Sequence, residues 1–294
     1  SDEGTYGERL RALGVPVYQL LGGMARTIEQ LASSRAGTLV GPPLLRQERG
    51  ERIPLSFAQE RMWFLHQLEG SQAYHLPAAY RLEGELDTAA LEQAIGEIIR
   101  RHEVLRTTLP EMDEGIPGQV IHPFEGFTLP VVDLSGESPA AQVERLRSVT
   151  TAHAEHPFDL AQGPVCIFRL VRCAEHEHLL LVNVHHVAFD GWSVDIFLYE
   201  LSVLYEAFCR GDDHPLAPLP VQYVDYAIWQ RKLLEGEYDN QQLAYWLEQL
   251  RDAPALDLPT DRPRPTQMSY RGALVHEYFS GETVERLRSF SKAA

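Results

Sequence analysis

Apolar and polar residues alternate along the chain in two periods, one typical of helices and one typical of strands. After Asp87 the apolar residues recur at a spacing of three and four, which predicts an amphipathic helix that begins there. Its apolar stripe is Leu91, Ala94, Ile95 and Ile98. Another helix is expected after Ser56, whose hydroxyl can cap it, because Gln59 completes a capping box. One face of that helix holds Phe57, Phe64, Leu65 and Leu68.

The centre of the chain has the pattern of a buried β-hairpin followed by a helix. Residues 165–172 and 178–185 are strand-forming runs, and the polar segment CAEHE between them predicts a turn. Residues 178–186 are apolar on both faces, so we expect this strand to be buried. Residues 80–86 alternate like a further strand. The helix after the hairpin would pack on the sheet through Phe197, Leu201, Leu204, Tyr205 and Phe208.

The two ends of the chain have different patterns. Residues 1–32 predict short helices, whereas residues 33–52 lack a period and are rich in Gly, Pro and Arg, as in a linker. Helices are also expected at about 222–235 and 240–251, followed by a strand in LVHEYF (274–279). An amphipathic helix has just begun where the chain ends, so we expect the chain to be cut from a larger polypeptide.

The composition narrows the classes of function. The formal charge is −16, from 42 acidic and 26 basic residues, which argues against nucleic acid and anionic membranes as partners. We find no apolar run long enough to span a bilayer and no leader sequence. The three cysteines (Cys166, Cys173 and Cys209) have no metal-ligand spacing, so we predict free thiols and a cytoplasmic location.

The segment VNVHHVAFDGWS (182–193) carries the candidate chemistry. Its adjacent residues His185 and His186 would point to opposite faces of a strand, so only one can face a given reactant. His186 comes at the carboxyl end of the strand, a frequent place for sites in α/β folds, and an imidazole can accept a proton. Gly191 would let a ligand or another backbone approach closely.

Asp190 lies between Phe189 and Trp192, so the sequence predicts a buried carboxylate. A buried carboxylate needs a cationic partner or several hydrogen bonds. We therefore assign Asp190 a structural role, paired with an arginine.

Simpler interpretations of the same residues remain. Both histidines could be satisfied core residues at the end of a strand. We expect no bound metal, because adjacent histidines on a strand diverge, and His176 and His178 fit an exposed hairpin turn better than a ligand pair. Ser193 lacks the second glycine of a hydrolase nucleophile elbow, so we expect it to hydrogen-bond the start of the following helix.

Several segments together resemble the condensation domains of nonribosomal peptide synthetases. The first four signatures of that family are matched in order by SFAQERMWFL (56–65), RHEVLRTTL (101–109), HHVAFDGWS (185–193) and YVDYAIWQR (223–231). HPFDLAQGPV (156–165) and LPTDRPRP (258–265) are also similar. The resemblance extends from about Ile53 to the end of the chain.

The resemblance implies an α/β fold: a chloramphenicol acetyltransferase-like two-layer sandwich with a mixed sheet, helices packed on it and a truncated second lobe. Residues 53–255 would form the N-terminal lobe, and residues 256–294 the crossover and the start of an incomplete C-terminal lobe. Residues 1–32 resemble the tail of a carrier protein without its phosphopantetheine serine. An amphipathic linker of paired helices explains them equally well.

The resemblance also implies a reaction and its residues. Two carrier proteins bring thioester-bound substrates to a channel, and the acceptor α-amine attacks the donor thioester to form an amide. His186 would face the channel as general base or as positioning group, with His185 supporting it and Gly191 helping to stabilise the oxyanion. Asp190 corresponds to the structural aspartate of the family, and Arg106 is preferred to Arg101 as its partner.

Several functions stay open at this stage. The residues of these motifs resemble those of domains that join an L-configured donor to an L-configured acceptor. Expected partners are donor and acceptor carrier proteins and an adenylation domain. Phosphopantetheine would arrive on the carriers, and no cofactor would be bound by this chain. Because much of the second lobe is missing, the chain alone is expected to be inactive. Alternatives are a catalytically silent homologue that recruits a partner and an acyltransferase that acts on a free amine or alcohol.

Overall fold

The computed structural model describes residues 43–69, 72–112, 115–234, 237–254, 259–263 and 277–293. The chain divides into two compact units, Ser1–Arg251 and Asp252–Ala294. The helices predicted in residues 1–32 lie outside the described residues, and so does the first half of the predicted linker. The domain boundaries proposed from the sequence stay predictions.

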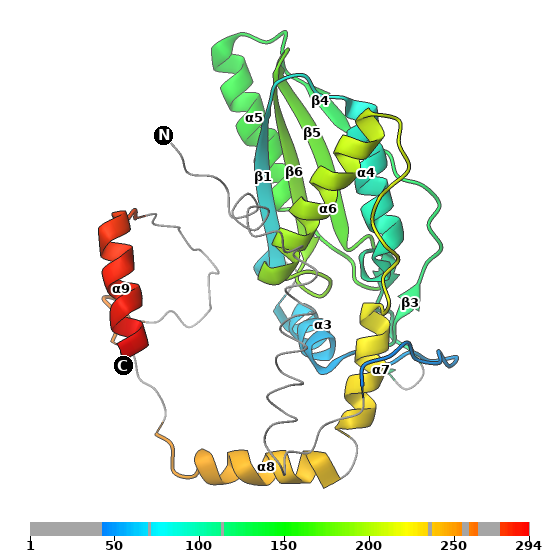
Figure 1. Cartoon of the computed structure of the whole chain (residues 1–294), viewed down its shortest axis with the longest axis vertical. Helices are drawn as coiled ribbons and strands as arrows, with labels where there is room; N and C mark the ends of the chain where they lie inside the picture. The colour runs from blue at the N-terminus through cyan, green and yellow to red at the C-terminus, as the bar shows by residue number, and fades with distance from the viewer. Residues whose placement is uncertain are drawn as a thin grey trace. The chain divides into compact units, whose positions relative to one another are not determined.

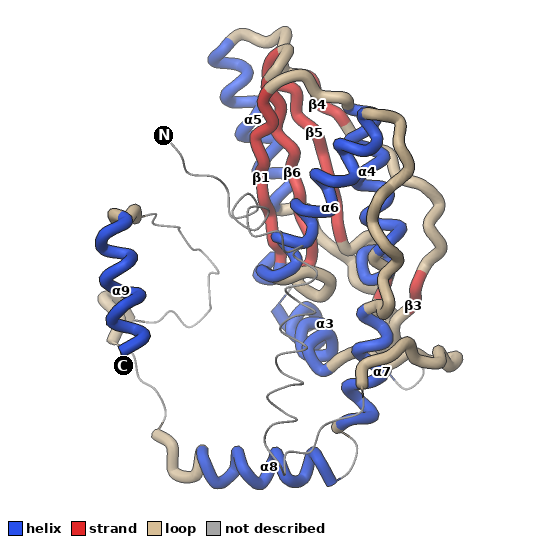
Figure 2. The backbone as a smooth tube through the Cα atoms, in the orientation of Figure 1, coloured by secondary structure: helices blue, strands red, loops and turns tan. Residues whose placement is uncertain are grey.

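A mixed four-stranded sheet forms the centre of the first unit (Figures 1 and 2). Its strands are β1 (His75–Glu83), β4 (Val131–Asp133), β5 (Cys166–Ala174) and β6 (Glu177–His185), in the order β1-β6-β5-β4. Only β4 runs parallel to its neighbour; the other pairs are antiparallel. A separate two-stranded ribbon joins β2 (Thr107–Thr108) to β3 (Val120–Ile121).

The predicted hairpin is confirmed as β5 and β6, with the exposed residues Glu175 and His176 at its turn. Strand β6 is buried along most of its length because helices cover both faces of the sheet. Helices α4 (Thr88–Arg101) and α6 (Gly191–Cys209) lie on one face, and α5 (Pro139–Ala154) lies on the other (Figure 1). A strand buried on both faces has a continuous apolar sequence, as here.

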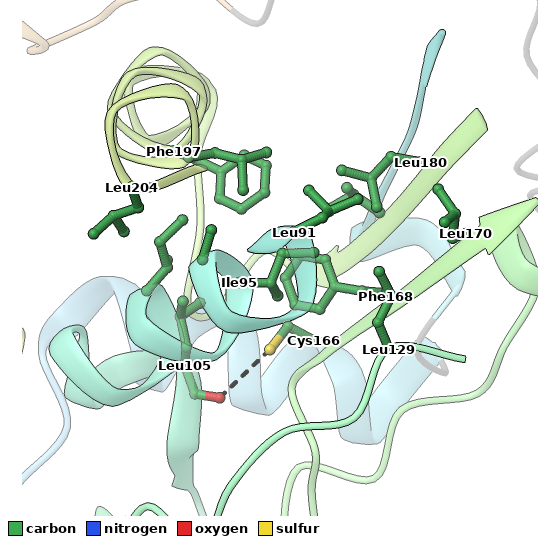
Figure 3. Packing of buried hydrophobic residues seen from close by; sticks show 14 of the residues in the cluster. Leu91, Ile95, Leu105, Leu129, Cys166, Phe168, Leu170, Leu180, Phe197 and Leu204 are labelled. Atoms are coloured by element: carbon green, nitrogen blue, oxygen red, sulfur yellow. Dashed lines mark hydrogen bonds between the residues drawn. The ribbon is translucent and has the colours of Figure 1, made fainter. Parts of the chain in front are cut away.

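The main core lies between α4, α6 and the sheet (Figure 3). Helix α4 begins directly after Asp87, as predicted, and the Asp87 carboxylate caps it by accepting a hydrogen bond from the Ala90 N–H at 3.0 Å. The predicted stripe of α4 is buried: Leu91, Ala94, Ile95 and Ile98 are at most 4% exposed. Burial of each leucine or isoleucine side chain contributes about 1.5–3 kcal/mol, so this stripe holds α4 on the sheet.

Helix α3 (Phe57–Glu69) begins with the predicted capping box, because Gln59 N–H donates to Ser56 Oγ and Ser56 N–H donates to Gln59 Oε1. The apolar face of α3 is largely exposed in the first unit, since Phe57, Phe64 and Leu68 are 42%, 56% and 65% exposed. The capping side of α3 packs on the lobe instead, where Trp63 Nε1 donates to the Leu109 carbonyl at 3.1 Å. The spacing of apolar residues predicted the helix, but it does not indicate which face of the helix other elements would bury.

The first unit also contains the short helices η1 (Gln72–Tyr74) and η2 (Glu103–Arg106), and helices α7 (Tyr223–Leu233) and α8 (Glu237–Gln249). Helix α9 (Gly281–Ala293) belongs to the second unit. Of the predicted strand 274–279, the described residues 277–279 have no regular secondary structure, and the rest lies outside the described part. Within the described part of the chain, no helix is both long and apolar enough to cross a membrane.

The described part of the predicted linker, residues 43–52, is held against the lobe. The Gln47 N–H donates to Asp225 Oδ1 at 2.9 Å, and Arg49 pairs with Glu103 at 2.7 Å. These residues form no helix or strand, as their composition indicates, but they follow the surface formed by η2 and α7.

Candidate active site

The motif histidines lie at the junction between β6 and α6. Strand β6 ends at His185, and the next residue, His186, lies in the turn that precedes α6. The His186 N–H donates to the Tyr74 carbonyl at 2.8 Å, which holds the turn against the end of β1. The His186 side chain is exposed and lines a cavity of about 640 Å³ with residues of α3, η2, α6 and α7. A substrate therefore has access to its ring.

His185 points the other way and is fully buried. Its Nδ1 accepts a hydrogen bond from the Val187 N–H at 3.1 Å, which stabilises the turn that carries His186. The rings of His66 and His75 lie 5.2 and 6.1 Å from the His185 ring, centre to centre. Burial, together with these histidines and His186, lowers the pKa of His185 to about 3. The two adjacent histidines thus point in different directions: His185 lies in the core, and His186, in the turn beyond the strand, lines the cavity.

The structure contradicts the prediction that Asp190 is buried and paired with an arginine. Asp190 is exposed and caps α6, because its carboxylate accepts from Ser193 N–H at 2.9 Å and from Ser193 Oγ at 2.7 Å. Among the described residues, no ion pair includes Asp190. An aspartate directly before a helix satisfies the first N–H groups of that helix, so its role here is local. The expectation that Ser193 bonds the helix start is confirmed.

Both arginines considered for Asp190 have other partners. Arg106 donates to the carbonyl oxygens of His122 and Arg100 and lies 3.8 Å from Glu103. Arg101 pairs with Glu200 of α6 at 3.0 Å. The preference for Arg106 as the partner of Asp190 is therefore wrong in this structure, and the ion pair that joins α4 to α6 uses Arg101.

Glu200 is a buried acid that the sequence analysis did not single out. Its carboxylate is bonded by Arg101 and, at 2.6 Å, by His102 Nε2. Burial alone would raise the pKa of Glu200, but the hydrogen bonds and charges of these two partners outweigh burial and lower it. The sequence contained one indication of this buried acid, because Glu200 interrupts the apolar face of α6 directly before Leu201.

Other groups at the site have structural roles or low reactivity. The Tyr223 hydroxyl lies 2.9 Å from Ser56 Oγ, and this contact joins α7 to the start of α3 beside the cavity. All three cysteines are free, and burial raises the pKa of Cys166 to about 12, which rules out a thiolate nucleophile at that position near neutral pH. Within the described residues, no three His, Cys, Asp or Glu side chains are arranged to hold a metal ion.

Gly191 is the first residue of α6, and a Cβ atom at this position would meet no atom within 4 Å. The start of α6 borders the cavity through Asp190 and Ser193, and the Ser193 N–H is already bonded by the Asp190 carboxylate. The arrangement offers one accessible imidazole and the positive end of a helix, a combination that suits a reaction in which an oxyanion forms.

The capping role of Asp190 leads to a modest expected effect of mutation. Asp190→Ala should lower the free energy of unfolding by about 1 kcal/mol, the usual cost of a lost N-cap. Urea unfolding of this variant and of Asp190→Asn, which keeps an acceptor, measures the effect. A loss of about 3–5 kcal/mol in the alanine variant would instead indicate a broken buried ion pair and would contradict this assignment.

A family model and several curated relatives match this chain. The family model for the condensation domain matches residues 50–294. The chain is 47% identical over 248 residues to part of the linear gramicidin synthase of Brevibacillus parabrevis, a match that covers 84% of this chain and 3% of that protein. It is 40% identical over 270 residues to malpinin synthetase of Mortierella alpina, covering 91% of this chain and 3% of the relative. The chain thus spans only a small part of these relatives.

Solved structures support the predicted fold. The X-domain from teicoplanin biosynthesis is 36% identical, with a TM-score of 0.69, and the match covers 78% of this chain and 50% of that structure. The first condensation domain of the calcium-dependent antibiotic synthetase matches with a TM-score of 0.58 at 24% identity, over 70% of this chain and 49% of that structure. The predicted chloramphenicol acetyltransferase-like fold is confirmed, and this chain belongs to the condensation-domain family of nonribosomal peptide synthetases.

Proposed function

We propose that this chain is the histidine-bearing part of a condensation domain that joins a carrier-bound acyl or peptidyl thioester to the α-amine of a carrier-bound aminoacyl acceptor. The observation that carries the proposal is the placement of the His186 ring, which is exposed in a cavity of about 640 Å³ at the start of α6. The L-to-L configuration suggested by the motifs is part of the same proposal.

The chemistry needs little from the protein beyond position and charge. The acceptor nitrogen attacks the thioester carbon, a C–N bond forms, the C–S bond breaks, and the pantetheine thiol leaves with one proton. An α-amine titrates near pH ~7.7–8.0 in water, so a substantial part is already neutral. His186 orients this amine and takes the proton that it loses. Backbone N–H groups at Gly191 stabilise the oxyanion of the tetrahedral intermediate.

The partners follow from the tethered substrates. Donor and acceptor carrier proteins would bring their phosphopantetheine arms to this cavity, and an adenylation domain would load them. The chain spans 49–50% of the solved condensation-type structures compared above, so one wall of the reaction channel would come from further sequence. Alone, the chain is expected to be inactive. A cytoplasmic location is proposed on the sequence argument only.

A second function has a specific observation in its favour. The X-domain structures are 36–37% identical to this chain, and one of them is a complex with OxyB. A silent homologue that recruits a partner is therefore the second candidate. The accessible His186 ring favours condensation over recruitment, because a recruiting domain has no need for an imidazole in a substrate-sized cavity.

The deciding experiment is a transfer assay with the parent synthetase that contains the complete domain. A donor-loaded and an acceptor-loaded carrier are mixed with it, and the condensed product on the acceptor carrier is measured by mass spectrometry. Amide formation supports the proposal. Tight carrier binding without any product would support the silent homologue, and product from a free amine at the same rate would favour an acyltransferase of small molecules.

A further inference from the structure

A second cavity, separate from that of His186, lies beside the start of β5. Its volume is about 510 Å³, and it shares no lining residue with the His186 cavity. Its walls come from η2, the segment before β4, the end of α5 and the first residues of β5. Strand β4 pairs with β5 only from Leu170 onward, so the sheet leaves the earlier residues of β5 uncovered on that edge.

The ionisable side chains of this cavity are basic, apart from the thiol of Cys166. Arg106, Arg169, His122, His153 and His156 line it, and no aspartate or glutamate is among its described lining residues. This composition is unusual in a chain with a formal charge of −16. Glu103 lies 3.8 Å from Arg106 but is itself paired with Arg49, so the lining keeps a positive potential that favours a negatively charged occupant.

Several of these groups have no partner within the protein. Among the described residues, Arg169 makes no ion pair and no side-chain hydrogen bond, although Arg81 and Arg172 of the same sheet are paired. The His153 side chain is 4% exposed, and its Nε2 has no hydrogen-bond partner. The buried Nε of Arg106 also lacks one. Arg169 is half-buried and lines the cavity, so its guanidinium presents a charge there that no carboxylate of the described residues neutralises.

We infer that this cavity binds an organic carboxylate with an apolar body, held through its carboxylate by the guanidinium of Arg169. The charge on the ligand is limited by the cations available. Both terminal nitrogens of Arg106 donate to backbone carbonyls. Arg169 is therefore the one arginine of the described lining whose terminal nitrogens can both bind a ligand. A single guanidinium matches a carboxylate in a bidentate pair, whereas a phosphate dianion needs more donors.

The apolar body of the ligand follows from the rest of the wall. Ile99, Phe127, Ile167 and Val165 line the same cavity. A volume of about 510 Å³ also exceeds what a carboxylate group alone would fill. The site is independent of the proposed condensation reaction, because it contains neither His186 nor Gly191.

Titration calorimetry of the chain with octanoate, octanol and inorganic phosphate tests the inference. Octanoate should bind, octanol and phosphate should bind more weakly, and Arg169→Gln should weaken octanoate about tenfold or more. Arg172→Gln is the matched control, because Arg172 lies on the same strand and pairs with Asp133 at 3.5 Å outside the cavity. Thermal unfolding verifies that both variants are folded.

A second measurement, by NMR, tests the same inference without relying on the binding affinity. Burial and then the charge of Arg169 lower the pKa of His153 to about 4. A carboxylate bound to Arg169 would lie close to His153, so octanoate should shift the ring resonances of His153 in NMR spectra at about pH 7, where the carboxylate is ionised. The inference is overturned if octanol binds as tightly as octanoate, if phosphate binds more tightly, or if octanoate does not bind at millimolar concentration. It is also overturned if Arg61→Gln, in the other cavity, weakens octanoate and Arg169→Gln does not.

Discussion

Replacement of His186 by alanine in the complete domain is expected to slow carrier-to-carrier transfer by about 10²–10⁴-fold, the usual contribution of a positioned acid–base group. The ring lies exposed at the turn before α6, and its backbone N–H bonds the Tyr74 carbonyl, so truncation removes the imidazole without disturbing the turn. Single-turnover transfer between loaded carriers measures the rate, and carrier affinity should not change.

Two further variants separate the possible roles of this ring. His186→Gln keeps a hydrogen-bonding side chain but cannot take a proton near neutral pH. If His186 only orients the amine, the glutamine variant should recover most of the lost rate; if it accepts the proton, it should not. His176→Ala, at the exposed hairpin turn, is the matched control. A wild-type rate in His186→Ala would remove the imidazole from the mechanism.

Acidification is expected to destabilise the lobe well above the pH at which carboxylates titrate. Burial lowers the pKa of His185 to about 3 and that of His153 to about 4, whereas an unfolded histidine titrates near 6.5. As the pH falls below about 6.5, the unfolded chain binds protons that the folded chain excludes. Stability is therefore present at high pH and is lost progressively down to the folded pKa values. Between pH ~7.5 and ~5.5, the free energy of unfolding should fall by about 1.4 kcal/mol for each of His185 and His153, or about 3 kcal/mol for the two together.

Urea unfolding at these two pH values measures the loss. His185→Gln should reduce the difference between the two pH values by about 1.4 kcal/mol, because one proton that the folded chain excludes no longer contributes. The matched change His176→Gln should leave the difference as it is, since solvent reaches that ring in the folded chain. Equal free energies of unfolding at both pH values would show that His185 and His153 are protonated in the folded state.

Local sequence patterns were sufficient for several elements and for the junction that carries the candidate site. The helix that begins at Asp87, the hairpin of β5 and β6, and the capping box of Ser56 and Gln59 were all predictable, because periodicity and capping act over a few residues. The opposite directions of His185 and His186 were also predictable, since neighbouring residues on a strand point to opposite faces.

Interactions between distant residues were decided only by the tertiary structure. The partner of Arg101 is Glu200, 99 positions away, and no local rule indicated this pair. The cap that Asp190 forms on α6 is local, but only the structure showed that Asp190 has no arginine partner among the described residues. The exposed face of α3 and the basic cavity around Arg169 likewise depend on which elements pack together. Amino-acid order determined which groups are present and how each segment folds, whereas ion pairs and cavities arise from contacts across long sequence separations, which leave no short-range pattern.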